Sequence, residues 1–487
     1  MPQISLTEHV EQLEKAVITE QTSAELLADF VYRTDYDDLP EEAIKMSREM
    51  VLDQLGVELA CSVLDWNTKV LKYVKDLGIE SDQATIVGSG VRSSAEYAAF
   101  VNATFGHGFE IDDFAPAAIA HPGCVAVPAA LNVGEREHLA GKDLLLGVAL
   151  ASEVITRIGE SGMKWMLARG FHETCILGVF GASAVAAKML GMNPKHITHA
   201  ISIAGSHASG TTEYTQSGGD VKRVHAGIGA NAGIRSALLA RNGLTGPPTI
   251  LEGKRGVLQS FGGQFITERL TEGLGDHYAF VSNGFKPYCC AIDIHSPIDA
   301  LARIIGAESL GSQDIAEIVV PVPHVVMLHS GTIGPEPHDI TGAQFSMHFS
   351  LALTVSKRSN NFDTYMDALS SDFKDPEVLE VARKVSVVEI PERENGKGTG
   401  TSKLTVKTKD GHTYVEDLLP SKGSPQNPMT YEELEDKFMG LATRVVPREQ
   451  ASKIAATVRN LEKVRDLRDL TDLLVSPGSR TRSPGGG

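Results

Sequence analysis

The apolar stretches in the first half of this sequence are rich in Ala and Gly, and this feature constrains the fold most. They occupy residues 126–133, 144–158, 178–190, 200–204 and 230–240 of a 487-residue chain. Small side chains let helices approach closely, so such runs favour helices packed on one another over isolated surface helices. We therefore expect a large helical core in this half.

Helix boundaries are marked at several points outside these runs. Thr22 with Glu25, and Thr430 with Glu433, form capping-box patterns typical of helix N-termini. Pro40 precedes apolar residues that recur on one helix face as far as residue 59, so a helix is predicted to begin there. Residues 451–474 are charged, have apolar residues at helical spacing, and predict a long helix.

The sequence changes character after about residue 275. Residues 315–322 and 385–390 are short and rich in β-branched residues, which favours strands. Residues 403–416 alternate on both sides of Asp410-Gly411, a pair that favours a tight turn with positive φ, so a β-hairpin is predicted. The fold class is therefore mainly α, with a large all-helical domain built from both chain ends and a smaller inserted α+β domain.

The predicted boundaries are 1–277 and 419–475 for the two parts of the helical domain, and 278–418 for the inserted domain. Residues 476–487 offer nothing to bury and are predicted to be disordered.

Charge and cysteine usage narrow the classes of function. The formal net charge is −17, which argues against nucleic acid as the main partner. No stretch approaches the ~20 apolar residues of a membrane span, and residues 1–20 lack the features of a signal or transit peptide. The five cysteines are irregularly spaced, so we expect small buried thiols in a reducing cytoplasm: Cys61, Cys124, Cys175, Cys289 and Cys290.

The segment GHGFEIDDFAPAAIAHP (106–122) is the most unusual part of the chain. It places His107, Glu110, Asp112, Asp113 and His121 close together in sequence. Carboxylates beside an imidazole suit acid–base chemistry, because they can orient the ring and adjust its pKa. The alternative is a structural role, in which an Asp caps a helix by accepting hydrogen bonds from its free backbone amides.

Two further segments carry polar groups among apolar or Gly-rich neighbours. In RGFHETCILG (169–178), His172 lies just before an Ala/Gly-rich helix, whose N-terminus favours anions; the alternative is a buried structural histidine. In EYTQSGGDVKRVHAGIGAN (213–231), Lys222, Arg223 and His225 offer cations that suit carboxylates. The alternative for this second segment is a solvated basic turn.

A fourth segment, FKPYCCAIDIHS (285–296), carries Lys286, Tyr288 and His295 where the helical pattern gives way to strands. Domain boundaries often hold small-ligand pockets, although this stretch also suits a structural boundary loop. The glycines near residues 88 and 227 lack the third glycine of a dinucleotide-binding motif, so no nucleotide cofactor is expected there.

Taken in order, these segments resemble the MmgE/PrpD family, which includes 2-methylcitrate dehydratase and cis-aconitate decarboxylase. The matching pieces are GHGFEIDD…HPG, RGFH…GVFGA, GGDVKRVHAG, LEGKRG and FKPYCC…IHSPIDA. The resemblance extends from about residue 28 to about residue 474. It implies a helical domain with an α+β lid, an active site between them, a homodimer, and no metal or organic cofactor.

The same resemblance implies a set of site residues. Catalytic positions are Asp112 or Asp113, His121, His172 and Lys222, and Lys286 and His295 match the domain-boundary motif as substrate-binding positions. Arg223 and Tyr288 are added as substrate-binding candidates because of their chemistry and their place in the third and fourth segments. The sequence departs from many relatives after the acidic pair, where Phe114 and Ala115 stand in place of a hydroxyl residue. A lid tyrosine of some decarboxylases also has no clear counterpart, and His329 or Ser330 stands near that place.

These residues support a hypothesis about mechanism. Cis-aconitate decarboxylation and methylcitrate dehydration both require cations on the carboxylates and one proton-transfer group. We assign Lys222, Arg223 and Lys286 to the carboxylates. His121, oriented by Asp112 or Asp113, is assigned to proton transfer, with His172 as a second binder or acid.

Three alternatives share these groups. An epimerase or isomerase of a dicarboxylate such as iminodisuccinate would return the proton to the opposite face. A metal-dependent hydrolase would use imidazole and carboxylate ligands, namely His107, Asp112, Asp113, His121 and His172. A non-catalytic polycarboxylate-binding protein would turn nothing over.

Overall fold

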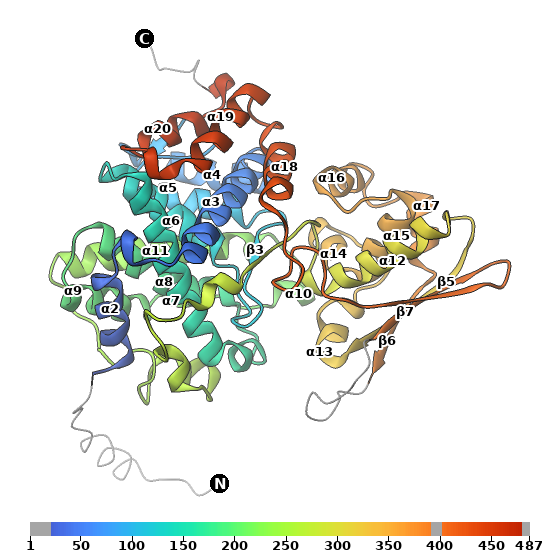
Figure 1. The fold of residues 1–487 in the computed structure, drawn as a ribbon, viewed down its shortest axis with the longest axis horizontal. Helices are drawn as coiled ribbons and strands as arrows, with labels where there is room; N and C mark the ends of the chain where they lie inside the picture. The colour runs from blue at the N-terminus through green and yellow to red at the C-terminus, as the bar shows by residue number, and fades with distance from the viewer. Residues whose placement is uncertain (1–20, 391–401, 480–487) are drawn as a thin grey trace, which may run out of the picture.

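A computed structural model describes residues 21–390 and 402–479, and it contains a large helical body and a smaller α+β part. Figure 1 shows the two beside each other, with the helix α18 near their junction. The mainly α fold class is therefore confirmed. The exact domain boundaries stay a prediction.

The helical body begins with eight helices, which contain four of the five predicted Ala- and Gly-rich runs. They are α2 (Ser23–Arg33), α3 (Glu41–Cys61), α4 (Asp65–Asp76), α5 (Ala95–Gly106), α6 (Gly123–Arg136), α7 (Gly141–Leu167), α8 (Glu173–Met189) and α9 (Pro194–Ala204). Short α10 (Tyr214–Ser217) leads to α11 (Val221–Arg241), and a two-stranded sheet of β1 (Glu80–Thr85) and β2 (Arg92–Ser93) flanks them. The capping box at Thr22 is confirmed.

Helix α11 runs through this body and packs against α8, α5 and α9. Glycine permits these contacts: a Cβ on Gly233 would lie 2.4 Å from the Cβ of Ala182, and one on Gly227 would lie 2.4 Å from the Phe100 carbonyl oxygen. Larger residues would force the helices apart, which is the physical reason for the small-residue composition.

The C-terminal segment returns to the helical body. Helix α18 (Tyr431–Ala442) starts with the predicted capping box and packs against α3. Lys437 donates to the carbonyl of Ile111 at 2.6 Å and forms a buried ion pair with Asp53, with Nζ and Oδ1 2.5 Å apart. Chain from both ends therefore completes one core.

The prediction of a long helix over 451–474 is wrong. Helix α19 (Arg448–Arg459) ends at Asn460, and only the short α20 (Arg468–Thr471) follows. Between them the chain runs beside the start of α7, where the backbone amide of Gly141 donates to Val464 and that of Leu467 donates to Leu139. These hydrogen bonds require non-helical backbone, so tertiary contacts override the local helical pattern.

The smaller part is built on a four-stranded sheet with strand order β6-β5-β7-β8. Its strands are β5 (Ile315–Pro323), β6 (Val385–Ile390), β7 (Lys403–Thr408) and β8 (Thr413–Asp417). The predicted strands and the hairpin at Asp410-Gly411 are confirmed, and Gly411 has a φ of 93°. The helices of this part are α12 (His295–Ala307), α13 (His324–Val326), α14 (Ile340–Phe345), α15 (Met347–Ser356), α16 (Phe362–Ser370) and α17 (Pro376–Ala382).

Three backbone segments meet where the two parts join. Strand β3 (Asp113–Phe114) pairs antiparallel with β4 (Gly284–Phe285). The amide of Phe285 donates to the carbonyl of Gly423, which lies on the chain returning from the sheet. Gly423 has a φ of 85°, and a Cβ there would lie 1.9 Å from the Phe285 oxygen, so only glycine fits. The first and fourth sequence motifs are thereby brought together.

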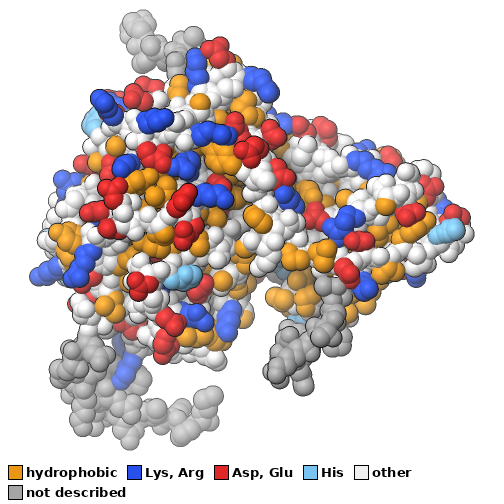
Figure 2. Space-filling model, viewed as in Figure 1, with side chains coloured by type: hydrophobic (Ala, Val, Ile, Leu, Met, Phe, Trp, Pro, Cys, Tyr) orange, Lys and Arg blue, Asp and Glu red, His pale blue; other side chains and the backbone are white. Residues whose placement is uncertain are grey.

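The surface and the chain ends relate to the predictions about nucleic acid, membrane spans and the terminal segments. In Figure 2, acidic and basic side chains are mixed over the visible face, without one large basic area. Among the described residues, no helix is long and apolar enough to cross a membrane. Residues 1–20 lie outside the described part. So does most of the predicted disordered tail, although Pro477–Ser479 forms a short 3-10 turn.

Candidate functional site

Four imidazoles from three sequence motifs form a row beneath the inserted domain. The ring centroids of His121 and His107 lie 5.3 Å apart, those of His107 and His172 lie 5.8 Å apart, and those of His172 and His225 lie 4.9 Å apart. His107 ends α5, His172 precedes α8, and His225 lies on the first turns of α11. Three helix ends therefore converge on one site, which we call the histidine row.

The tautomer of His121, a member of the histidine row, is fixed by its neighbour. Nδ1 of His121 lies 2.7 Å from the backbone carbonyl of Asp113, which can only accept, so Nδ1 carries a proton. Nε2 of His121 lies 3.9 Å from Glu173 Oε1, beyond hydrogen-bond distance. This nitrogen is thus available to accept or give a proton, which is the arrangement that a general acid–base group needs.

The two adjacent aspartates have different roles. The Asp112 carboxylate accepts from His107 Nδ1 at 2.6 Å and lies 3.6 Å from His121 Nδ1. Burial alone would raise the pKa of Asp112, but His121 and His107 hold that pKa below its ordinary value. Asp112 is therefore an anion that serves two imidazoles.

Asp113 points its carboxylate away from the histidine row. It accepts from the Gly123 amide at 2.9 Å, at the first residue of α6, and from Asn283 at 3.3 Å. It orients His121 through its backbone carbonyl rather than through its carboxylate. Burial, with the charge of Asp112, raises the pKa of Asp113. The helix-end role considered for an Asp in this segment therefore fits Asp113.

His172 and His225 share a hydrogen bond deep in the site. Their Nδ1 atoms are 2.9 Å apart, so one ring donates to the other. The pKa of His172 is lowered by burial first, and then by His225 and His121. His172 Nε2 lies 3.4 Å from Glu173 Oε1 but has no hydrogen bond among the described residues. A neutral, buried imidazole with a free nitrogen suits substrate binding or proton exchange.

Glu173 belongs to the site but was not predicted. Its carboxylate lies near both His121 and His172, and burial raises its pKa. In the sequence it is the acidic residue of a first helical turn, a common position that gives no signal of function. Its position directly after His172 was the one available indication.

Two buried lysines meet around one carboxylate beside the histidine row. Lys222 forms an ion pair with one oxygen of Glu110, and the other oxygen lies 3.2 Å from Lys286. Lys222 is 4% exposed and Lys286 is 1% exposed, so both ammonium groups are shielded from water. The pKa of Lys222 is lowered by burial, then by Lys286 and Arg223. Two buried cations with one carboxylate leave a local positive excess that suits a second anion.

Lys222 also connects this lysine pair to the histidines. Its charge contributes to lowering the pKa values of His107 and His225, behind the larger effect of burial. Lys286 likewise contributes to lowering the pKa of Asp112. Cations and proton-transfer groups therefore lie in one electrostatic neighbourhood.

Arg223 connects three parts of the protein through its guanidinium. Its guanidinium donates to the Gly108 carbonyl at 3.0 Å, to Asp220 at 3.1 Å and to Thr341 of α14 at 3.1 Å. It also lies 4.5 Å from the ring centroid of Trp66. This geometry makes Arg223 an anchor between α11, the first motif and the inserted domain.

Tyr288 and His295 lie at the domain junction with partners of their own. The Tyr288 hydroxyl donates to Asp299 at 2.5 Å, and its ring meets that of His295 edge-on with centroids 5.1 Å apart. His295 Nε2 donates to the Cys290 carbonyl at 3.2 Å. Burial, followed by the charge of Lys286, lowers the pKa of His295 to about 3. Neither ring has a recorded contact with the histidine row among the described residues.

His329 and Ser330 lie on the inserted domain and share a carboxylate. His329 Nδ1 lies 3.2 Å from Asp293 Oδ2, and the Ser330 hydroxyl donates to the same oxygen at 2.6 Å. Burial lowers the pKa of His329, but Asp293 outweighs this effect and raises it overall. Burial raises the pKa of Glu173 overall, and the charge of His329 is one of the smaller effects that lower it.

One group of side chains has atoms close enough to hold a metal ion. Ligand atoms of His107, Asp112 and Cys124 all lie within 4.8 Å of one another. The Cys124 thiol donates to the His121 carbonyl at 3.1 Å, and burial raises its pKa, followed by the charges of Asp112 and Asp113. A metal ion would have to displace the thiol proton in order to bind Cys124.

Comparison with known proteins places the chain in a family. The MmgE/PrpD N-terminal domain model matches residues 25–269, and the MmgE/PrpD C-terminal domain model matches residues 288–463. Together they cover most of the chain, which therefore belongs to the MmgE/PrpD family. The resemblance seen in the sequence motifs is confirmed.

Several curated relatives match over nearly their full length. The chain is 26% identical to a cis-aconitate decarboxylase-like protein of Aspergillus oryzae, over 92% of this chain and 96% of the relative. It is 25% identical to a cis-aconitate decarboxylase of Aspergillus terreus, over 91% and 93%. It is 26% identical to the cis-aconitate decarboxylase of Mus musculus, over 93% of each chain.

Proposed function

We propose that this protein is a cofactor-independent lyase that acts by proton transfer on a small di- or tricarboxylate such as cis-aconitate or 2-methylcitrate. The observation that carries the proposal is His121, whose Nδ1 is fixed by a carbonyl while its Nε2 is available. The charges of Lys222 and Lys286 act on its neighbours His107 and Asp112. The family and the names of the curated relatives support the reaction class.

Lys222 and Lys286 would bind the carboxylates of the substrate. Lys222 and Lys286 hold Glu110 between them, and a substrate carboxylate can take up the remaining positive charge. Charge-assisted hydrogen bonds in a water-poor site are stronger than those in water, so two lysines suffice to orient a polycarboxylate. A substrate that presents its carboxylates to the lysines places its carbon skeleton toward the histidines.

The histidine row would carry out the proton-transfer steps. In decarboxylation, the C–C bond to one carboxylate breaks, carbon dioxide leaves, and the electron pair stays on the substrate as an allylic carbanion. His121 Nε2–H then gives its proton to carbon, and solvent restores the proton to the imidazole. In dehydration, the same nitrogen would remove a proton α to a carboxylate while hydroxide leaves and is protonated. His172 and Glu173 are placed to assist as second binder and acid.

The first test is product analysis in D₂O. Protein dialysed against EDTA is incubated with cis-aconitate or 2-methylcitrate and followed by proton NMR. Loss of carbon dioxide with deuterium at one carbon is expected for the decarboxylase, and a new alkene for the dehydratase. Deuterium exchange or inversion without loss of a group would favour the epimerase. Activity that appears only after Zn²⁺ is restored, or no change in any tube, would contradict the proposal.

Two variants assign the proton-transfer role. His121→Gln should lower the rate by roughly 10²–10⁴, the range for removal of a general acid or base. His138→Gln is the matched control, because His138 is an exposed imidazole paired with Asp466 far along the chain. A loss under about tenfold in His121→Gln, with unchanged circular dichroism, would remove His121 from the mechanism. The homodimer implied by the resemblance and the cytoplasmic location inferred from cysteine usage stay predictions, which sedimentation and fractionation test.

A further inference from the structure

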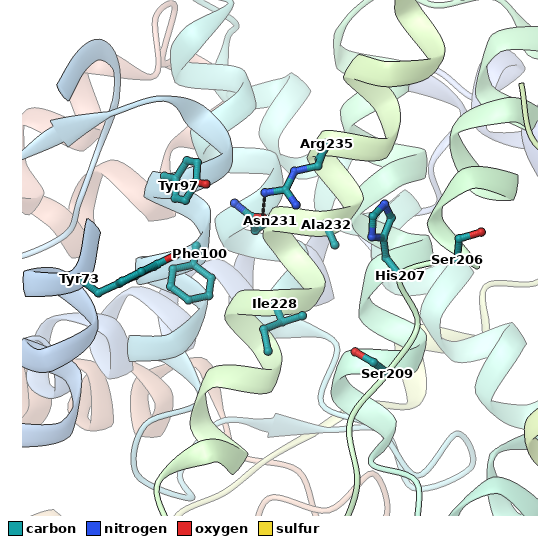
Figure 3. A pocket seen from close by; sticks show the side chains of 10 residues that line it. All are labelled: Tyr73, Tyr97, Phe100, Ser206, His207, Ser209, Ile228, Asn231, Ala232 and Arg235. Carbon is teal, nitrogen blue, oxygen red and sulfur yellow. Dashed lines mark hydrogen bonds between the residues drawn. The ribbon is translucent and has the colours of Figure 1, made fainter. Parts of the chain in front are cut away.

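A groove separate from the histidine row lies on the outer face of α11. Its volume is about 490 Å³, within the ~300–1,000 Å³ of small-ligand sites. Ile228, Asn231, Ala232 and Arg235 contribute its floor from one helix face, at the i, i+3, i+4 and i+7 spacing. Figure 3 shows aromatic side chains on one side of this helix and His207 on the other.

The polar part of the groove is cationic. Arg235 donates to the side-chain oxygen of Asn231 at 2.6 Å, and Asn231 in turn donates to the carbonyl of Glu96 at 3.0 Å. Within residues 21–390 and 402–479, Arg235 forms no ion pair, and no carboxylate lines the groove. His207 lines it as well, and its pKa is lowered by burial and then by the charge of Arg235. Its guanidinium charge is therefore not neutralised by a neighbouring carboxylate within the groove.

The opposite wall is aromatic. Tyr97 and Phe100 of α5, with Tyr73 of α4, line that side, and the Tyr73 and Phe100 rings meet edge-on with centroids 6.2 Å apart. Such a wall offers a flat apolar surface, while the hydroxyl of Ser209 lines the groove near His207. One side therefore suits a planar group and the other an anion.

We infer that this groove binds a small organic anion, whose carboxylate or phosphate group lies between Arg235 and His207 and whose flat portion lies against Tyr97 and Phe100. A guanidinium whose single recorded partner is an amide oxygen can turn its fork toward two anionic oxygens. The groove takes a ring-bearing anion better than a bare ion, because a bare ion would leave the aromatic wall uncovered.

The position of the groove connects it to the histidine row. His225 lies one turn before Ile228 on the same face of α11. The turn that carries His207 and Ser209 ends at Gly210, whose carbonyl accepts from the His172 amide at 3.1 Å. Ser209 also lies 3.4 Å from the sulfur of Cys175 in α8. An anion bound to His207 would hold this turn in place and would thereby help to fix the position of His172.

The test is calorimetric titration of the full protein with phenyl phosphate and with benzoate, and with inorganic phosphate as the ringless probe. Arg235→Gln should weaken binding of the ring-bearing anion by about tenfold or more, because a charge-assisted pair is lost. His207→Asn should weaken it severalfold and flatten its pH dependence, since binding should strengthen as His207 gains a proton. Arg241→Gln is the matched control, an exposed arginine at the end of the same helix.

The outcomes separate the possibilities. Binding that depends on Arg235 and not on Arg241, and that is weaker for inorganic phosphate, supports the inference, and the stronger of the two ring-bearing probes identifies the anionic group. Equal binding to both arginine variants would place the anion elsewhere, including the histidine row, and would overturn it. The absence of binding at millimolar concentrations would also overturn it, as would a changed sedimentation mass in Arg235→Gln, which would show that a second copy covers the groove.

Discussion

Replacement of Arg223 by lysine tests whether this residue anchors the protein or binds substrate. The guanidinium holds Gly108 and Thr341 at once and stacks over Trp66, and an ammonium group can replace only one of these interactions. Its third partner, Asp220, is 58% exposed and contributes little because water screens the pair. Arg223→Lys keeps the charge and thus isolates the geometry.

The magnitude follows from the interactions that a lysine at this position cannot make. One charge-assisted hydrogen bond disappears, although the Gly108 carbonyl retains a second donor from Trp66 at 3.2 Å. With the stacking over Trp66 also removed, the free energy of unfolding should fall by about 2–4 kcal/mol. The affinity for substrate should change little, because we assign carboxylate binding to Lys222 and Lys286.

Urea unfolding followed by tryptophan fluorescence measures the effect, since Trp66 is one of two tryptophans in the chain. Arg241→Lys on the same helix is the control, with an expected change within about 0.5 kcal/mol. The reasoning is refuted if Arg223→Lys unfolds at the same urea concentration as the control while KM for the substrate rises tenfold or more. Arg223 would then be a substrate ligand, as the sequence alone suggested.

Three further predictions concern other parts of the molecule. Lys437→Met should lower the free energy of unfolding by about 3–5 kcal/mol, because Asp53 is left buried without its cation, and Asp53→Asn added to it should recover part of the loss in urea unfolding. Asp293→Asn should lower the pKa of His329 in an NMR titration, because Asp293 raises that pKa. The pair therefore stabilises the inserted domain below about pH 6.5, and this contribution is lost as pH rises through the folded-state pKa. An unchanged titration would show that the pair does not form. Gly423→Ala should destabilise the protein clearly more than Gly411→Ala in thermal unfolding, since both have positive φ but only the former meets a backbone oxygen; equal losses would contradict the close approach.

Much of the fold was predictable because its signals are local. The capping boxes at Thr22 and Thr430 and the Asp410-Gly411 hairpin depend on residues within a few positions, and the structure confirms them. The helix over 451–474 failed for the opposite reason. Its pattern was helical, but hydrogen bonds to residues 139–141, far away in sequence, fixed another backbone path.

The sequence indicated which residues form the candidate site, but it did not indicate how they are arranged. Unusual residues in four motifs pointed to the histidines and lysines, and the structure brings most of them together. The bond between His172 and His225 joins residues 53 positions apart. The role of Asp113 depends on its backbone carbonyl rather than on its side chain. Neither fact has a signature in a single sequence, because each arises from the packing of separate helix ends.

The ion pair between Asp53 and Lys437 has a consequence for how the protein is made. A ribosome synthesises α3 long before α18, and at ~5–20 residues per second the roughly 380 residues between these partners take about 20–75 seconds. During that interval α3 exposes the face that α18 will cover, and Asp53 has no cation. The helical body therefore cannot reach its final packing before α18 is made, although all four strands of the inserted domain have been synthesised by then. A chain truncated before α18 should stay incompletely folded and bound to chaperones. Folding of the helical body is therefore completed only after the C-terminal segment that contains α18 has been synthesised.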